Sequence, residues 1–205
     1  MSFRRLKKEM SSLLVRENAD TACARLMELP GRRIVNPLFS LFHSGDDRLR
    51  WRAITAMGIV VARLADQEIE SARVVMRRLM WTLNDESGGI GWGSPEAMGE
   101  IMARHQRLAD EYACVLVSYV NESGNYLEHE ILQRGALWGV GRLARISPGH
   151  VAAAGDHIAP YLRSADHFLR GLSLWAVTPL KLNHLETMYA SLTNDTNRIS
   201  LYEND

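Results

Sequence analysis

The segment LQRGALWGVGRLA, residues 132–144, places two small residues three positions apart, at Ala136 and Gly139, among longer apolar side chains. Residues three apart lie on one face of an α-helix, so small side chains at that spacing let a neighbouring helix approach closely. The segment therefore predicts a helix that packs tightly against another helix.

The same pattern occurs four times along the chain. The copies are AITAMG, SPEAMG, ALWGVG and SLWAVT, at residues 53–58, 94–99, 136–141 and 173–178. Each has a small residue at its first and fourth positions and an apolar residue at its fifth. The fourth positions are residues 56, 97, 139 and 176, so the copies are 41, 42 and 37 residues apart. A spacing near 40 indicates an internal helical repeat.

Another helical stretch and a turn precede each copy. These leading stretches are NPLFSLF, RVVMRRLMWTL, YACVLVSYV and HIAPYL. A unit of helix, turn and helix cannot bury its apolar face alone, so the units must stack. Pro37 and Pro95 suit the first turns of helices, with Asn36 and Ser94 as their caps. No stretch shows the sustained alternation of a strand, so we expect essentially no sheet.

We therefore predict an all-α fold, a short right-handed α-solenoid of helix-turn-helix repeats with helical caps at both ends. One domain is expected to span residues 1–205, with helices near 3–16 and 18–29 at its start and near 182–193 at its end. The predicted parts are an N-terminal cap (1–31), four units (32–66, 67–107, 108–147 and 148–179) and a C-terminal cap helix with a polar tail (180–205).

This pattern resembles the HEAT-like repeat proteins, the armadillo-type α-solenoids. The resemblance is carried by LRWRAITAMGIVVARL, LQRGALWGVGRLA and FLRGLSLWAV, and it covers about residues 33–178. It implies a curved surface that binds other macromolecules. A minority of such proteins are enzymes. The segment IGWGSPEAMGE departs from the family, because a glycine-rich turn replaces the short link between paired helices.

Composition restricts the classes of partner. Lys plus Arg and Asp plus Glu both total 24, so the formal net charge is zero. That balance argues against nucleic acid or an anionic membrane as the main partner. No run approaches the roughly 18 apolar residues of a membrane span, and the N-terminus lacks the apolar core of a signal peptide. We expect a cytoplasmic protein with no membrane contact.

Neither a metal site nor a cofactor site is expected. Cys23 and Cys114 lie in apolar helical runs, so we expect buried structural thiols. The seven histidines are scattered and form no HExxH motif. The glycines at 89, 91 and 93 fail the nucleotide-binding fingerprints, because no Lys follows and acids crowd the segment. We therefore predict no metal, no cofactor and no catalytic residue.

The stretch NDESGGIGWGS, residues 84–94, is longer than the usual link between paired helices. Loops of this kind often carry function, and a tryptophan is typical of binding hot spots. An alternative is that Ile90 and Trp92 fold back and plug the core. Asp85, Glu86 and Glu96, with Glu100 one helical turn after Glu96, form an acidic pocket, or they are the ordinary polar residues of a turn. The candidate binding residues here are Asn84, Asp85, Glu86, Trp92 and Glu96.

A second set of candidate binding residues lies in the second helices of the later units. Arg134 lies four residues before Trp138, and Arg170 lies five residues before Trp175. If these helices line the concave surface, the four side chains form a recognition stripe. The alternative is that the tryptophans belong to the core, because stacking buries them. We take Arg134, Trp138 and Arg170 as further candidate binding residues.

We predict a non-enzymatic binding or scaffold module that holds a protein partner or a small ligand through its concave face and the loop 84–96. Its oligomeric state is open. The alternative is an enzyme that resembles the HEAT-like DNA-alkylpurine glycosylases and uses tryptophans with Asp85 or Glu96. That alternative requires a continuous Lys/Arg stripe in the groove. A third hypothesis, a role in chromophore or metalloenzyme maturation, requires a reactive exposed cysteine.

Overall fold

The computed structural model describes residues 2–84 and 91–202. Within these residues it has eleven α-helices, four short 3-10 helices and no strand. The predicted all-α class is therefore confirmed. None of the described helices is both long enough and apolar enough to cross a membrane.

Two short helices begin the chain, as predicted. They are α1 (Phe3–Arg16) and α2 (Ala19–Met27), and the side chains of Ser2 and Asn18 cap their N-termini. Paired helices follow. The pairs are α3 (Gly31–Leu41) with α4 (Asp47–Gln67), α5 (Ile69–Leu83) with α6 (Ser94–Arg104), and α7 (Gln106–Ser118) with α8 (Glu130–Ile146).

The fourth pair is irregular. Its first part consists of the 3-10 helix η1 (Pro148–Val151), the short helix α9 (Ala154–Ile158) and η2 (Ala159–Arg163), and its second part is α10 (His167–Val177). The chain then passes through η3 (Thr178–Leu180) and η4 (Asn183–Leu185) to α11 (Glu186–Leu192). The exact boundaries of the predicted units stay a prediction.

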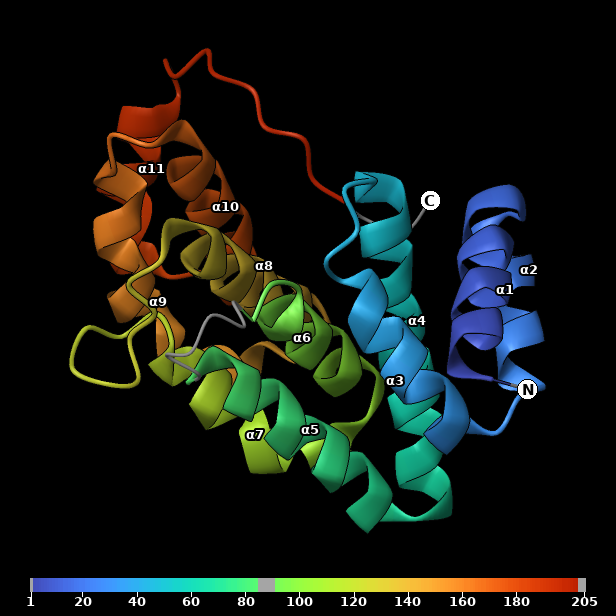
Figure 1. The fold of residues 1–205 in the computed structure, drawn as a ribbon. Coiled ribbons are helices and arrows are strands. Elements are labelled where there is room, and N and C mark those ends of the chain that lie inside the picture. Colours follow the sequence, from blue (N-terminus) through green and yellow to red (C-terminus); the bar gives the residue numbers. More distant parts are fainter. Residues whose placement is uncertain (1, 85–90, 203–205) are drawn as a thin grey trace.

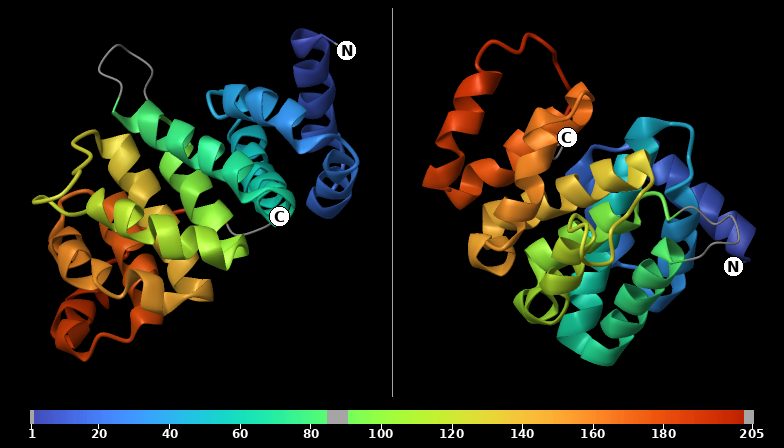
Figure 2. Two further views of the ribbon diagram at one scale, coloured as in Figure 1. Left: turned by 90° about the horizontal axis from the view of Figure 1, so that it is seen from below. Right: turned by 90° about the vertical axis from the view of Figure 1, so that its left-hand side faces the viewer.

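The helices form two layers (Figures 1 and 2). The second helices α4, α6, α8 and α10 pack side by side in the inner layer. The outer layer packs against these inner helices. It consists of the first helices of the pairs, α3, α5 and α7, and of the short pieces of the fourth pair. Stacking of this kind gives every unit an apolar neighbour, which is what a single unit lacks.

Glycines bring the inner helices into backbone contact. A Cβ atom added at Gly99 of α6 would lie 2.5 Å from the Cα atom of Gly139 of α8. One added at Gly139 would lie 2.6 Å from the carbonyl oxygen of Pro95. Any side chain at either position would push the two helices apart, so the close approach predicted from the repeated small residues is confirmed.

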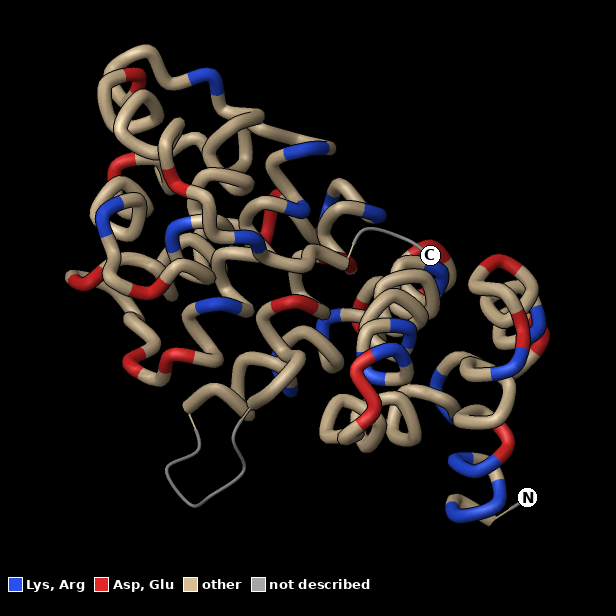
Figure 3. The backbone as a smooth tube through the Cα atoms, turned by 90° about the horizontal axis from the view of Figure 1, so that it is seen from above, with Lys and Arg blue, Asp and Glu red and all other residues tan. Residues whose placement is uncertain are grey.

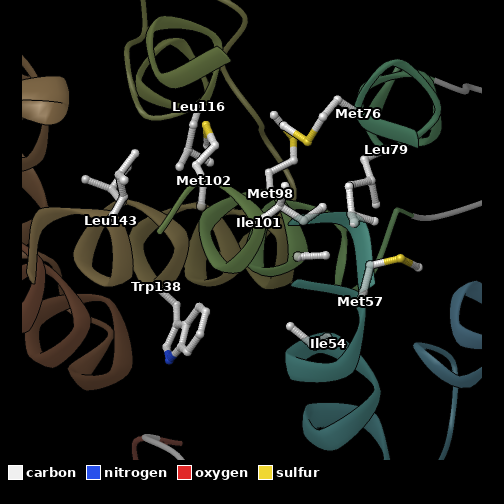
Figure 4. Close-up of a cluster of buried hydrophobic side chains, with 14 of the residues drawn as sticks. Ile54, Met57, Met76, Leu79, Met98, Ile101, Met102, Leu116, Trp138 and Leu143 are labelled. Atoms are coloured by element: carbon white, nitrogen blue, oxygen red, sulfur yellow. The ribbon is translucent and has the colours of Figure 1, made fainter. Parts of the chain in front are cut away.

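The core fills the space between the layers and is rich in methionine (Figure 4). Met57, Met76, Met98 and Met102 are all buried there, and unbranched methionine side chains fill irregular gaps well. Burial of each such side chain contributes about 1.5–3 kcal/mol. Trp138 points to the opposite side of α8 from Leu143 (Figure 4). The inner layer therefore has a core face and a second face that bears aromatic side chains.

The predicted helix start at Pro37 is wrong, whereas Pro95 lies in the first turn of α6 as predicted and only its cap residue differs. Pro37 and Asn36 lie inside α3, which begins at Gly31 because burial of Ile34 and Val35 extends the helix toward Pro30. Asn36 instead accepts a hydrogen bond from Arg78. Ser94 is the first residue of α6, and Gly93 is its N-cap. The φ of Gly93 is 78°, a left-handed conformation that glycine adopts without strain.

The expectation of two buried thiols is also wrong. Cys114 is exposed, because α7 buries the opposite side, with Leu108, Ala113 and Leu116. Cys23 is half-buried, and this burial raises the pKa of its thiol. Within residues 2–84 and 91–202 no cluster of three or more His, Cys, Asp or Glu is placed to hold a metal ion.

Candidate functional site

A cavity of about 750 Å³ lies on the inner layer, where the first turns of α4, α6, α8 and α10 meet the C-terminal tail. We call it the inner cavity. Its volume falls within the range of about 300–1,000 Å³ that is typical of small-ligand sites. Another hollow, of about 590 Å³, lies between α1 and α2, but charged surface residues such as Arg5, Lys8 and Glu9 line most of it.

Stacked aromatic rings form one side of the inner cavity. The ring centroids of Trp51 and Trp138 lie 4.8 Å apart, and Trp138 stacks on Trp175 at 5.9 Å with an interplanar angle of 21°. The Tyr202 ring stacks on Trp51 at 5.2 Å with an angle of 7°. Offset aromatic pairs at these distances contribute about 0.5–1.5 kcal/mol beyond the burial of their area. The wall therefore already holds one flat ring, that of Tyr202, stacked on Trp51.

The carboxyl group of Glu96 lies in the same cavity, in the first turn of α6. The residue is half-buried, but its Oε2 atom is buried and has no hydrogen-bond partner among the described residues. Gly135 of α8 leaves the room for it, because a Cβ atom there would lie 2.7 Å from Oε2.

Burial raises the pKa of Glu96 to about 7, although its own backbone N–H and, more weakly, Arg50 lower it. Burial has this effect because a low-dielectric environment disfavours the charged form of a carboxyl group. Near neutral pH the group is therefore present both as a carboxylate that accepts a hydrogen bond and as an acid that donates one.

Trp92 takes part in both the core and the cavity. Its half-buried ring packs against the hydrophobic core and lines the inner cavity. Its Nε1 atom is buried, and no described residue hydrogen-bonds to it. Within the described part of the chain, the cavity thus contains two polar groups without a partner, an indole N–H and a carboxyl oxygen.

Carboxylates neutralise two of the arginines at the cavity. Arg134 pairs with Glu130 and, at 3.0 Å, with Asp166, while its guanidinium lies over the Phe168 ring. Arg50 pairs with Asp47 at 3.1 Å. Basic and acidic positions are interspersed over the molecule (Figure 3). The described lining therefore does not form the continuous Lys/Arg stripe that a nucleic-acid groove requires.

Arg170, unlike Arg134, does not line the inner cavity. It donates to Asp195 at 2.6 and 2.9 Å and to the carbonyl oxygens of Ser164 and Ala165. Asn197 and Arg170 hydrogen-bond to Asp195 and lower its pKa to about 2. Arg170 thus fastens the start of the tail, whereas Arg134 and Trp138 line the cavity.

The structure separates the predicted acids. Asn84 is the exposed C-cap of α5, and Asp85 and Glu86 lie outside the described residues. Glu100 is buried and pairs with Arg104 at 2.6 Å and with Arg142 at 2.9 Å. The suggestion that Glu100 joins Glu96 in an acidic pocket is therefore wrong, because two arginines hold Glu100 within the helix packing.

Sequence reasoning did not identify Trp51, Gly135 or Tyr202. A signal for Trp51 exists in the repeat: Glu96, Trp138 and Trp175 share the third position of the repeated segment. One helical turn earlier, the same alignment gives Trp51, Trp92, Arg134 and Gly171. The repeat register therefore marks five of the lining residues, Trp51, Trp92, Glu96, Arg134 and Trp138.

No protein-family model matches the chain, and no curated protein matches it significantly. Among solved structures, the crystal structure of an engineered protein is similar, with a TM-score of 0.54 and 16% sequence identity. The similarity covers 96% of this chain and 91% of that one.

An archaeal HEAT-like repeats protein from Thermococcus onnurineus NA1 gives a TM-score of 0.40 and 17% identity, over 95% of this chain and 75% of that chain. That TM-score is too low to support an argument. The similarity to the engineered protein shows the fold alone. The conclusion at this point is structural: the chain is an all-α array of stacked helix pairs.

Proposed function

We propose that this protein is a non-enzymatic binding module whose inner cavity holds a planar aromatic group with a polar edge. A protein partner or a small ligand presents that group. The site consists of the aromatic wall on α4 and α8, with Trp92 and Glu96 at the end of the glycine-rich stretch.

One observation carries the proposal: two buried polar atoms, Oε2 of Glu96 and Nε1 of Trp92, have no hydrogen-bond partner among residues 2–84 and 91–202, although both residues line one cavity. A buried polar atom without a hydrogen bond costs about 1–3 kcal/mol. A ligand that provides an acceptor for Trp92 and a partner for Glu96 removes that cost. The unpaired atoms therefore supply specificity, and the aromatic wall supplies contact area.

A titration with small aromatic probes tests the proposal. We expect indole, adenine or tyrosinamide to change the tryptophan fluorescence in a saturable way and to raise the Tm. Glu96→Gln should weaken binding of the probe that binds best about tenfold. Glu128→Gln, which changes an exposed loop residue, is the matched control. Absence of saturable binding by all three probes would contradict the proposal.

A second candidate function is base removal from DNA, because Glu96 shares the cavity with Trp51, Trp92 and Trp138. Aromatic rings stack on a flipped base, and a carboxylate stabilises the positive charge that develops on the sugar when the base leaves. The paired arginines weaken this candidate. Incubation with duplex DNA that contains alkylated purines tests it. Free base released by the wild type and not by Glu96→Gln would favour the enzyme over the binding module.

A further inference from the structure

The end of the described chain lies at the opening of the inner cavity. We call residues 196–202 the tail segment. It continues from α11, at one end of the array, and reaches α4 toward the other end (Figure 1). Its residues from Arg198 to Tyr202 form one wall of the cavity.

Charged and polar contacts hold the start of the tail. Asp195 accepts from Arg170 and also from the backbone and side-chain N–H groups of Asn197. This anchor fixes the direction in which the tail leaves α11, and it lies outside the cavity. The part of the tail beyond Asn197 adds contacts of a different kind.

The distal tail makes side-chain contacts typical of a bound peptide. Ile199 packs over Gly171 of α10, where an added Cβ atom would lie 2.6 Å from its Cδ1 atom. Tyr202 stacks on Trp51, and the Nε1 atom of Trp138 donates to the Tyr202 carbonyl oxygen at 3.3 Å. Ile199 is half-buried between exposed Arg198 and Ser200, and Leu201 and Tyr202 are both half-buried.

The tail fills the cavity incompletely. It supplies an aromatic ring and an aliphatic side chain, but neither Oε2 of Glu96 nor Nε1 of Trp92 has a partner in the described tail or elsewhere in the described chain. A segment with the same apolar contacts and a hydrogen-bond donor placed toward Glu96 would satisfy more of the site than the tail does.

We propose that the tail segment is an internal ligand, and that the inner cavity binds in its place an extended peptide segment of a partner protein. This inference rests on the proposed function and names its ligand class. The partner segment has an aliphatic residue three positions before an aromatic one, as Ile199 precedes Tyr202, and a hydrogen-bond donor beside the aromatic residue. Gly171 receives the aliphatic side chain, Trp51 the ring, and Trp138 a backbone carbonyl oxygen.

Fluorescence anisotropy with a labelled peptide of residues 196–202 tests the inference. The receptors are the full chain and a chain that ends at residue 197, which retains Asn197 and its bonds to Asp195. We expect saturable binding to the shortened chain and at least tenfold weaker binding to the full chain. Tyr202→Ala in the peptide, or Trp51→Leu in the shortened chain, should each reduce binding at least tenfold, whereas Ser200→Ala in the peptide should not.

Three outcomes would overturn the inference. If the peptide fails to bind the shortened chain while the best aromatic probe still binds, the tail is only a structural flap and the proposed function stands. If neither binds, both ideas fail. If the full chain is a dimer that shortening converts to a monomer, the natural occupant is the tail of a second copy.

A second variant covers the case in which the shortened chain does not fold. Ile199→Ser with Tyr202→Ala in the full chain removes both apolar contacts and keeps the anchor at Asp195. Circular dichroism checks that this variant is folded. We expect it to bind the wild-type peptide as the shortened chain would, and binding no tighter than that of the unaltered full chain would contradict the inference.

Discussion

At the third position of the repeated segment the four units carry Thr55, Glu96, Trp138 and Trp175. A carboxyl group therefore stands in a row that elsewhere bears a hydroxyl and two indoles. Sequence reasoning found four members of the site: Trp92 and Glu96 from the glycine-rich stretch, and Arg134 and Trp138 from the second helices of the repeats. It could not find Tyr202, because no local pattern shows where a polar tail crosses the molecule.

The raised pKa of Glu96 makes stability depend on pH. A folded-state pKa of about 7 lies above the ordinary 4.5, so the folded state binds the proton more tightly. The contribution of Glu96 to stability is therefore greatest at low pH and decreases as pH rises from about 4.5 to about 7. We expect Glu96→Gln to leave stability unchanged near pH 4 and to increase it above pH 7, by no more than about 3 kcal/mol.

Urea unfolding of wild type, Glu96→Gln and the control Glu128→Gln between pH 4 and pH 8 measures this effect. Acid denaturation by other groups affects all three proteins alike, so the difference between the curves isolates Glu96. Parallel curves for wild type and Glu96→Gln would show that the carboxyl group is solvated.

At the scale of the helix, apolar spacing predicts the inner helices well because their buried residues recur every three to four positions. It fails where proline intervenes. Pro160 has no N–H to donate, so helix α9 ends at Ile158 and the chain continues as a 3-10 turn. The leading stretch of the fourth unit is therefore broken, although its apolar side chains Ile158, Tyr161 and Leu162 are still buried.

The contact between α6 and α8 yields the second prediction. Gly99→Ala places a methyl group 2.5 Å from the Gly139 backbone, which has no flexible side chain to move aside. We expect a loss of about 1–3 kcal/mol or more in the free energy of unfolding, as for an overpacked core. Gly149→Ala is the matched control, because nothing lies within 4 Å of an added Cβ atom there. Equal melting of the two variants would contradict the close approach.

For the whole molecule, the tail segment adds contacts that no repeat unit supplies, because it joins Trp51 of α4 to the end of the chain. Local sequence patterns report on neighbours within a helix or between successive units. A contact between distant segments depends on the curvature of the array. This is why the fold could be predicted and the occupant of the cavity could not.

Release of the tail yields the third prediction. Arg170→Leu removes the anchor to Asp195, so the tail should leave the cavity more often. Trypsin cleaves after Arg198, an exposed residue of the tail. In the Arg170→Leu variant we expect several-fold faster cleavage at this site, measured by mass spectrometry. Arg163→Leu changes an exposed arginine outside the cavity lining and is the control. An unchanged rate for Arg170→Leu would show that the distal contacts alone hold the tail.

Because the tail segment is covalently attached, it sets a minimum affinity that any competing ligand must have for the cavity. A ligand joined to its site by a few residues acts as if present at an effective concentration on the order of 1 mM. If the free peptide bound with a Kd of about 100 μM, the tail would fill the cavity about nine-tenths of the time. A partner would then bind about tenfold more weakly than its intrinsic affinity. Short sequences that merely resemble the tail are thereby excluded, and a partner gains entry by pairing with Glu96 and Trp92 or by engaging a second surface.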